Sequence, residues 1–173
     1  MRKKITLLIL LAIMLVGFIN PGEKLSFKES IQLFKNEAEN NLSPYKFDGT
    51  IVTYFYFKTY QQKKEVEIYF FNQTEYRLSF NGKCLPHDIE VNIYDKKRSE
   101  NDRVLLKRFK NISGKNIIIN SNEFYKNLTI EKRECNQFKR VYIDYDIPSI
   151  PEANNLTPET NERAAVVLAV GYK

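Results

Sequence analysis

The feature that most constrains this chain is the alternation of apolar and polar residues that begins at Gly49. Short β-rich runs recur about every ten to fifteen residues between clusters of turn-forming or charged residues, as half-buried strands joined by turns do. The predicted strands cover residues 50–58, 65–70, 76–81, 89–93, 104–109, 116–120, 125–131, 140–146 and 164–172. The 11 Tyr and 12 Phe favour such strands. Eight or nine strands without intervening helices predict an all-β fold, namely a jelly-roll-like β-sandwich.

The last of these runs, residues 164–172, is apolar at nearly every position rather than at alternate ones. A strand of that kind is buried on both of its faces. We therefore expect it in the centre of a sheet and not at an edge.

One helix is predicted ahead of the strands. Ser26 and Glu29 form the S-x-x-E pattern of a capping box, in which the two side chains reciprocally accept backbone N–H groups at a helix start. Apolar residues then follow at spacings of four, three and four, at Phe27, Ile31, Phe34 and Ala38. We expect an amphipathic helix with its linker over residues 22–44 and the β-sandwich domain over residues 45–173.

The N-terminus has the order of an export signal. Three basic residues at positions 2–4 precede an uninterrupted, largely apolar run over residues 5–19, and Pro21 follows. At about 1.5 Å per residue the run spans roughly 22 Å, short of a hydrocarbon core about 30 Å thick. We predict that residues 1–21 are a cleaved signal peptide, with a permanent anchor as the alternative. The domain is then periplasmic, on the outer surface or extracellular, or else anchored at the inner membrane.

The net charge of +6 does not indicate a nucleic-acid partner. Three of the 27 basic residues belong to the export segment, which contains no acidic residue, so 24 basic and 21 acidic residues remain. That balance is typical of an ordinary protein surface. The sequence therefore predicts no nucleic-acid binding, and membrane contact only through residues 5–19 if they are not cleaved.

Cys84 and Cys135 are the two cysteines of the chain. In an exported protein such a pair is most simply a disulfide, which would close a loop of about fifty residues and stabilise the fold by roughly 4 kcal/mol. Two free thiols are the alternative. A catalytic pair of Cys84 with His87 is disfavoured, because a nucleophile and its base normally meet in space rather than three residues apart in a turn.

Neither a metal nor a cofactor is predicted. His87 is the single histidine and lies in a turn before a strand, so a zinc site lacks ligands. Asp144 and Asp146 share one strand face and Asp95 begins a charged loop, but the spacing of a calcium-binding loop is missing.

Two surface features are candidates for contact with a partner. The first is a basic run interrupted by Glu100 and Asp102, whose default interpretation is a solvated loop and strand edge. Its alternative role is contact with an acidic partner, such as an anionic glycan or a lipid headgroup. The run comprises Lys96, Lys97, Arg98, Arg103, Lys107, Arg108 and Lys110. The second feature is a strand face with Tyr54, Tyr56 and Tyr60, which either packs against another layer or forms an exposed aromatic surface.

Four segments carry a resemblance to known proteins: residues 75–80 (EYRLSF), 88–96 (DIEVNIYDK), 142–148 (YIDYDIP) and 171–173 (GYK). They resemble segments of uncharacterised small secreted β-sandwich proteins of Bacteroidetes-type bacteria, in a likeness that spans most of residues 45–173. The strand that ends at Asp95 is also similar to one in pre-peptidase C-terminal-like domains, whose acidic calcium pattern is missing. The resemblance implies export and a β-sandwich and supplies no catalytic residue.

We therefore expect an exported, non-enzymatic binding or accessory module of the periplasm or cell envelope, with an envelope protein or a glycan as its partner. No catalytic residue is assigned, and the binding residues stay open. One alternative is a small secreted hydrolase in which Asp144, Asp146 and Glu90 converge. The other is a domain displayed at the membrane by its uncleaved N-terminal segment.

Overall fold

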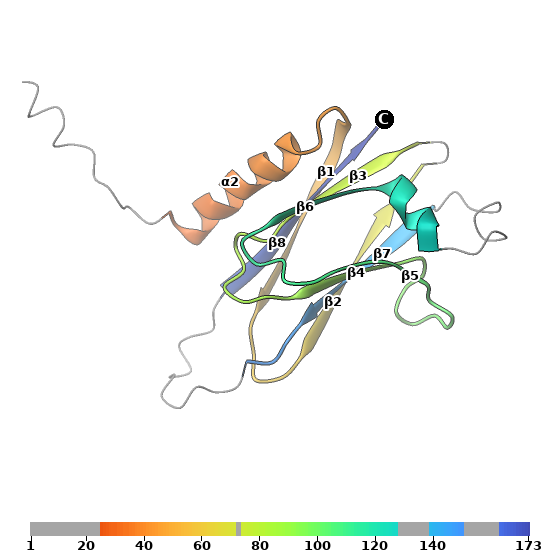
Figure 1. Ribbon diagram of the computed structural model, residues 1–173. Coiled ribbons are helices and arrows are strands. Elements are labelled where there is room, and N and C mark those ends of the chain that lie inside the picture. The colour runs from red at the N-terminus through yellow and green to blue at the C-terminus, as the bar shows by residue number, and fades with distance from the viewer. Residues whose placement is uncertain (1–24, 72–73, 128–138, 151–162) are drawn as a thin grey trace, which may run out of the picture.

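The computed structural model describes residues 25–71, 74–127, 139–150 and 163–173, which form two four-stranded sheets with an α-helix on the outside (Figure 1). Sheet A has the order β1 (Lys46–Tyr56), β8 (Arg163–Tyr172), β3 (Tyr76–Asn81), β6 (Asn116–Asn120). Sheet B has the order β2 (Gln62–Tyr69), β7 (Arg140–Ile147), β4 (Glu90–Tyr94), β5 (Leu105–Phe109). All neighbouring strands are antiparallel. This order is that of an eight-stranded jelly roll, so the predicted all-β sandwich with one helix is confirmed.

The core lies between the two sheets and is built from alternate residues of each strand. From β3 it takes Tyr76, Leu78 and Phe80, and from β7 it takes Val141, Ile143, Tyr145 and Ile147. All seven side chains are fully buried, as the alternation in the sequence predicted. Burial also raises the pKa of the Tyr145 hydroxyl, so this group stays protonated.

β8 lies between β1 and β3 in the middle of sheet A, which confirms the prediction drawn from its two-sided apolar sequence. One of its faces, with Ala164, Val166, Leu168 and Val170, belongs to the core between the sheets. The other face, with Ala165, Val167 and Ala169, packs under the helix. Near the end of β8, Gly171 lies close to the segment that follows α2. A Cβ on Gly171 would be 3.0 Å from the Lys46 carbonyl oxygen and 3.3 Å from Leu42 Cδ1.

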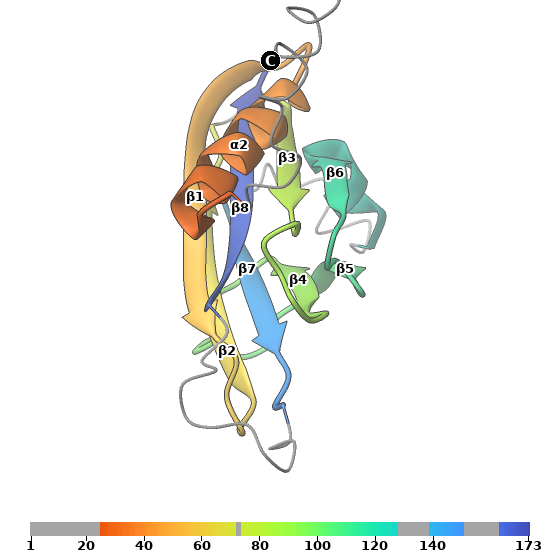
Figure 2. The same ribbon diagram turned by 90° about the vertical axis from the view of Figure 1, so that its left-hand side faces the viewer.

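The predicted helix is α2 (Phe27–Asn40), which lies across β8 and β3 on the outer face of sheet A (Figure 2). Its capping box is present: the Ser26 N–H donates to Glu29 at 2.8 Å, and the Glu29 N–H donates to the Ser26 hydroxyl at 3.3 Å. Ile31 and Ala38 are buried against the sheet. Glu37 then fastens the helix to the sheet by accepting from Asn81, Lys83 and Asn116.

The predicted strand over residues 125–131 is wrong for residues 125–127, the part of it that the structure describes. Residues 125–127 belong to the 3₁₀-helix η1 (Ser121–Asn127), and residues 128–131 lie outside the described residues. The Ser121 hydroxyl accepts the Tyr76 N–H at 2.9 Å, and Phe124, three residues later, is fully buried in the core. A spacing of three between anchored residues fits a 3₁₀ turn and not the period of two of a strand.

The N-terminal part of the chain has described residues only from Leu25 onward, so the export segment over residues 1–21 lies outside them. The helix begins at Phe27 and the first strand at Lys46. Within the described residues, no helix has the length and apolar character that crossing a membrane requires.

Candidate binding surface

Two tyrosines of β1 lie on the outside of sheet A. Ile51 and Phe55 point into the core, so Tyr54 and Tyr56, at the alternate positions, point outward. Their exposed fractions are 48% and 45%, which shows that neither serves as core. α2 crosses β8 and β3, and it leaves the Tyr56 end of β1 uncovered (Figure 2).

An arginine stacks on the rings of Tyr54 and Phe27. The Arg163 guanidinium carbon lies 4.6 Å from the ring centroid of Phe27 and 5.4 Å from that of Tyr54, and the two centroids are 6.4 Å apart. Phe27 begins α2 and Arg163 begins β8, so three elements meet here. The attraction between a cation and aromatic faces keeps the guanidinium over the rings. We call Phe27, Tyr54, Tyr56 and Arg163 the aromatic surface.

Tyr60 does not share the strand face expected from the sequence. β1 ends at Tyr56, where the Gln62 side-chain amide donates to the Tyr56 carbonyl at 2.7 Å and closes the β1–β2 turn. Tyr60 lies within that turn, exposed, and its hydroxyl accepts from Lys58 at 2.7 Å. The expected tyrosine face therefore holds for Tyr54 and Tyr56 only.

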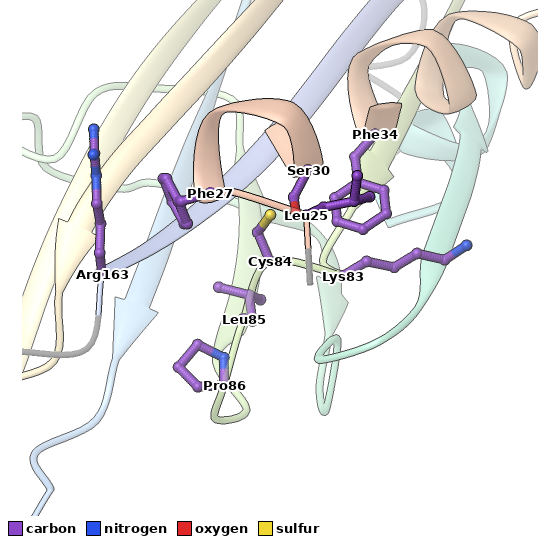
Figure 3. Close-up of a pocket in the computed structure, with 9 residues that line it drawn as sticks. All are labelled: Leu25, Phe27, Ser30, Phe34, Lys83, Cys84, Leu85, Pro86 and Arg163. Carbon is purple, nitrogen blue, oxygen red and sulfur yellow. The ribbon is translucent and has the colours of Figure 1, made fainter. Parts of the chain in front are cut away.

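A hollow of about 550 Å³ adjoins the aromatic surface, between the start of α2, the loop after β3 and the start of β8 (Figure 3). Its lining is of mixed character and comprises Leu25, Phe27, Ser30, Phe34, Lys83, Cys84, Leu85, Pro86 and Arg163. Figure 3 shows the Lys83 and Arg163 side chains extending away from Cys84 on opposite sides. Lys83 pairs with Glu37 at 2.5 Å, so the open hollow combines apolar side chains with one paired and one ring-stacked cation.

Cys84 is half-buried in the lining of this hollow. Burial raises the pKa of its thiol, which favours the neutral, unreactive form. Cys135 lies outside the described residues, so the Cys84–Cys135 disulfide stays a prediction.

The three carboxylates of the hydrolase alternative lie on the outer face of sheet B, each with a basic partner. Asp144 pairs with Arg103 at 2.9 Å and with Arg98 at 3.2 Å. Across the sheet, Glu90 of β4 lies opposite Asp146 of β7. Asp146 pairs with Lys63 at 2.9 Å and Glu90 with Lys110 at 3.3 Å. These pairs give the hydrolase alternative no support.

Asp144 is the most deeply buried of these acids, with 2% of its surface exposed. Burial alone would raise its pKa, but Arg103 and Arg98 outweigh burial and hold the pKa below the ordinary value. Arg103 also lies 3.8 Å over the Tyr94 ring and donates to the Lys96 carbonyl at 2.8 Å. Asp144 is therefore an ionised anchor for the loop over residues 95–104, and a poor proton donor.

His87 and Asp95, the other side chains considered as metal ligands, have structural contacts. His87 packs edge-on against the Phe57 ring, with centroids 5.0 Å apart. Asp95 accepts the Val104 N–H at 2.6 Å and so closes the loop over residues 95–104 at its base. Among the residues described, no group of three or more His, Cys, Asp or Glu side chains is arranged to hold a metal ion.

The basic run is largely neutralised within the molecule. Besides Arg98, Arg103 and Lys110, Arg108 lies 3.9 Å from Glu90 and Lys107 lies 3.5 Å from Glu123. Five of its seven basic side chains therefore have an acidic partner. The alternative role of this run, contact with an acidic partner, gains no support from the structure.

Sequence reasoning did not find Phe27 and Arg163 as surface residues. The spacing predicts Phe27 on the apolar face of the helix, where it does pack in part, and Arg163 directly precedes the predicted last strand. Arg163 lies beside the tyrosines because it is paired with Tyr56 in the β1–β8 ladder. The sequence does not show which strands pair or in which register, so it gave no signal for Arg163.

In comparisons with known proteins, no family model, no curated protein and no solved structure matches this chain.

Proposed function

We propose that this protein is an exported, non-enzymatic binding or accessory module of the cell envelope, and that its partner contacts the aromatic surface. The observation that carries the proposal is the exposure of Tyr54 and Tyr56 beside the stacked Arg163. Tyrosine and arginine are enriched among residues that dominate binding energy at interfaces. A tyrosine ring also offers a large apolar face with a polar end and few rotatable bonds.

An envelope protein or a glycan is the partner we propose. The rings of Tyr54 and Tyr56 supply apolar area, and the Arg163 guanidinium supplies several donors for carbonyl, hydroxyl or carboxylate oxygens. The adjoining open hollow of about 550 Å³ adds apolar side chains together with the charged groups of Lys83 and Arg163, and its volume is within the size range of small-ligand sites. Together these features suit a partner that presents both an apolar group and oxygen acceptors.

The non-enzymatic part of the proposal is supported by the paired carboxylates of sheet B. A general acid needs a raised pKa, whereas Asp144 has a lowered one and is held by two arginines. The hydrolase alternative lacks a comparable supporting observation.

The exported part of the proposal rests on the basic-then-apolar order of residues 1–21. Mass spectrometry of the N-terminus of the protein recovered from the cell envelope or medium tests it. We expect a chain that begins near residue 22. An intact Met1 in the membrane fraction would instead establish the tethered alternative.

To test the binding proposal, the protein recovered after export is immobilised, and the envelope components that it retains are measured. We expect the wild-type protein to retain a component, and the double variant Tyr54→Ala/Tyr56→Ala to lose it. Tyr69→Ala is the matched control, because Tyr69 is also an exposed strand tyrosine stacked by an arginine, but on β2 of sheet B. Protease treatment of the envelope material would abolish retention of a protein partner, and periodate oxidation that of a glycan. Retention by neither wild type nor control, or equal retention by all three proteins, overturns the proposal.

A further inference from the structure

The sandwich has four edge strands, and three of them carry features that oppose pairing with another strand. β2 has four charged residues along its length, Lys63, Lys64, Glu65 and Glu67. β5 has only five residues, includes Lys107 and Arg108, and has an irregular register with β4. β6 also has five residues and leads directly into η1. Charge, shortness and irregularity are the usual protections of exposed edges.

β1 lacks these protections where it is most regular. It is the longest strand of the sandwich, with 11 residues, and its segment from Gly49 to Tyr56 contains no charged residue and no proline. The register irregularity lies at the other end, between Phe47 and Gly49. Figure 2 shows β1 along the outer margin of sheet A, with the start of α2 in front of it. The helix contacts β1 from the outer face, where Thr50 donates to Glu39 and Tyr54 packs on Phe27, and β8 is the one described strand hydrogen-bonded to β1.

We propose that the edge of β1 with which no other described strand pairs is hydrogen-bonded antiparallel to β1 of a second copy of this chain, so that the two A sheets form one continuous eight-stranded sheet. An unprotected edge presents N–H and C=O groups that another strand satisfies. A second copy fits because the segment is self-complementary. In a two-fold register centred on Thr53, Val52 lies opposite Tyr54 on the outer face and Ile51 lies opposite Phe55 on the inner face.

Pairs of an aromatic with a β-branched residue are among the favourable cross-strand pairs. No like charges meet in this register, because residues 49–56 are uncharged. The two-fold axis also keeps both outer faces on the same side. The two aromatic surfaces would therefore lie on one side of a single sheet, and the dimer would present its partner with two contact sites.

Sedimentation velocity of the exported protein over a range of concentrations tests the inference. We expect a species of twice the chain mass, and its loss in the double variant Tyr54→Lys/Tyr56→Lys. Tyr69→Lys places a lysine on the edge strand of the other sheet and is expected to leave the dimer intact. Because both β1 side chains are exposed, circular dichroism should show unchanged folding, and Tyr56→Lys alone provides a milder second variant.

Hydrogen exchange provides a direct measurement of the edge. Amides within residues 50–56 should exchange more slowly at high protein concentration than at low concentration, while those of β2 should not change. A protein that is monomeric at every concentration overturns the inference. So does a dimer that persists in both β1 variants, or one that forms only with an unlike protein from the envelope.

The inference stands apart from the proposed function, and one variant separates them. Arg163→Ala removes the cation from the aromatic surface but leaves the β1 edge unchanged, so we expect weaker retention of envelope material and an intact dimer. Normal retention by a strictly monomeric protein would overturn the dimer and leave the binding proposal in place.

Discussion

The Arg103 guanidinium donates a hydrogen bond of 2.9 Å to the Asp144 carboxylate, and this contact holds the loop over residues 95–104 against the outer face of sheet B. Both groups are shielded from water, with 14% of the Arg103 side chain and 3% of the Asp144 side chain exposed. Removing one partner of a shielded pair leaves the other charge poorly compensated.

We therefore expect Arg103→Ala to lower the free energy of unfolding by about 3 kcal/mol. Lys107→Ala is the control, because its pair with Glu123 is longer and more exposed, and it should cost less than about 1 kcal/mol. Urea unfolding at neutral pH measures both values. Equal losses in the two variants would show that Arg103 does not anchor the loop.

Acid should weaken the fold through the same carboxylate. Burial opposes ionisation of Asp144, but Arg103 and Arg98 lower its pKa in the folded protein below the unfolded value of about 3.9. The stabilisation is therefore complete above that pH and is lost as the pH falls through the folded pKa. We expect the free energy of unfolding to fall below about pH 4, and to fall less steeply in Asp144→Asn. Parallel pH profiles from urea unfolding would contradict this assignment.

Substitution by alanine should affect stability differently at Gly171 and at Gly49. A Cβ on Gly171 would lie 3.0 Å from the Lys46 carbonyl oxygen and 3.2 Å from Tyr45 Cβ, whereas a Cβ on Gly49 would meet nothing within 4 Å. We expect Gly171→Ala to destabilise by about 1–3 kcal/mol, through overpacking where the chain after α2 meets β8. Gly49→Ala should change stability by less than about 1 kcal/mol. Similar unfolding free energies in the two variants would contradict the close approach at Gly171.

The predicted disulfide between Cys84 and Cys135 is tested by thiol labelling of the denatured protein after purification without reductant. We expect no label without reduction and two labels after it, counted by intact mass. Cys84→Ser should then destabilise the protein by roughly 4 kcal/mol, because the loop of about fifty residues is no longer closed. Two labels before reduction would establish free thiols, the alternative kept from the sequence.

The strands and their faces could be predicted because alternation is a local property of the sequence. In β7, Val141 and Ile143 point to the core and Asp144 points away, as the period of two requires. The burial of both faces of β8 could also be predicted, because residues 164–172 are apolar at nearly every position. The 3₁₀-helix η1 was missed because its anchors, Ser121 and Phe124, depend on contacts with distant parts of the chain.

The site was less predictable, because its parts come from different elements. Tyr54 and Tyr56 were found from the strand, but Phe27 and Arg163 join them only through the β1–β8 register and the placement of α2. In the same way the acidic character of Asp144 and the basic character of Arg103 were both visible. Their pairing was not, because it depends on the path of the loop over residues 95–104.

The central position of β8 also makes the assembly of sheet A depend on residues 163–172. β8 is the last of the eight strands along the chain, yet it provides the pairing surface for both β1 and β3 and the floor on which α2 packs. Without residues 163–172, β1 and β3 have no common neighbour in sheet A, and α2 lacks the apolar face of Ala165, Val167 and Ala169 on which it packs. The β1–β8 ladder joins the first and the last of the described strands, so sheet A depends on a non-local pairing, which is slow to form and leaves strand edges exposed until it does.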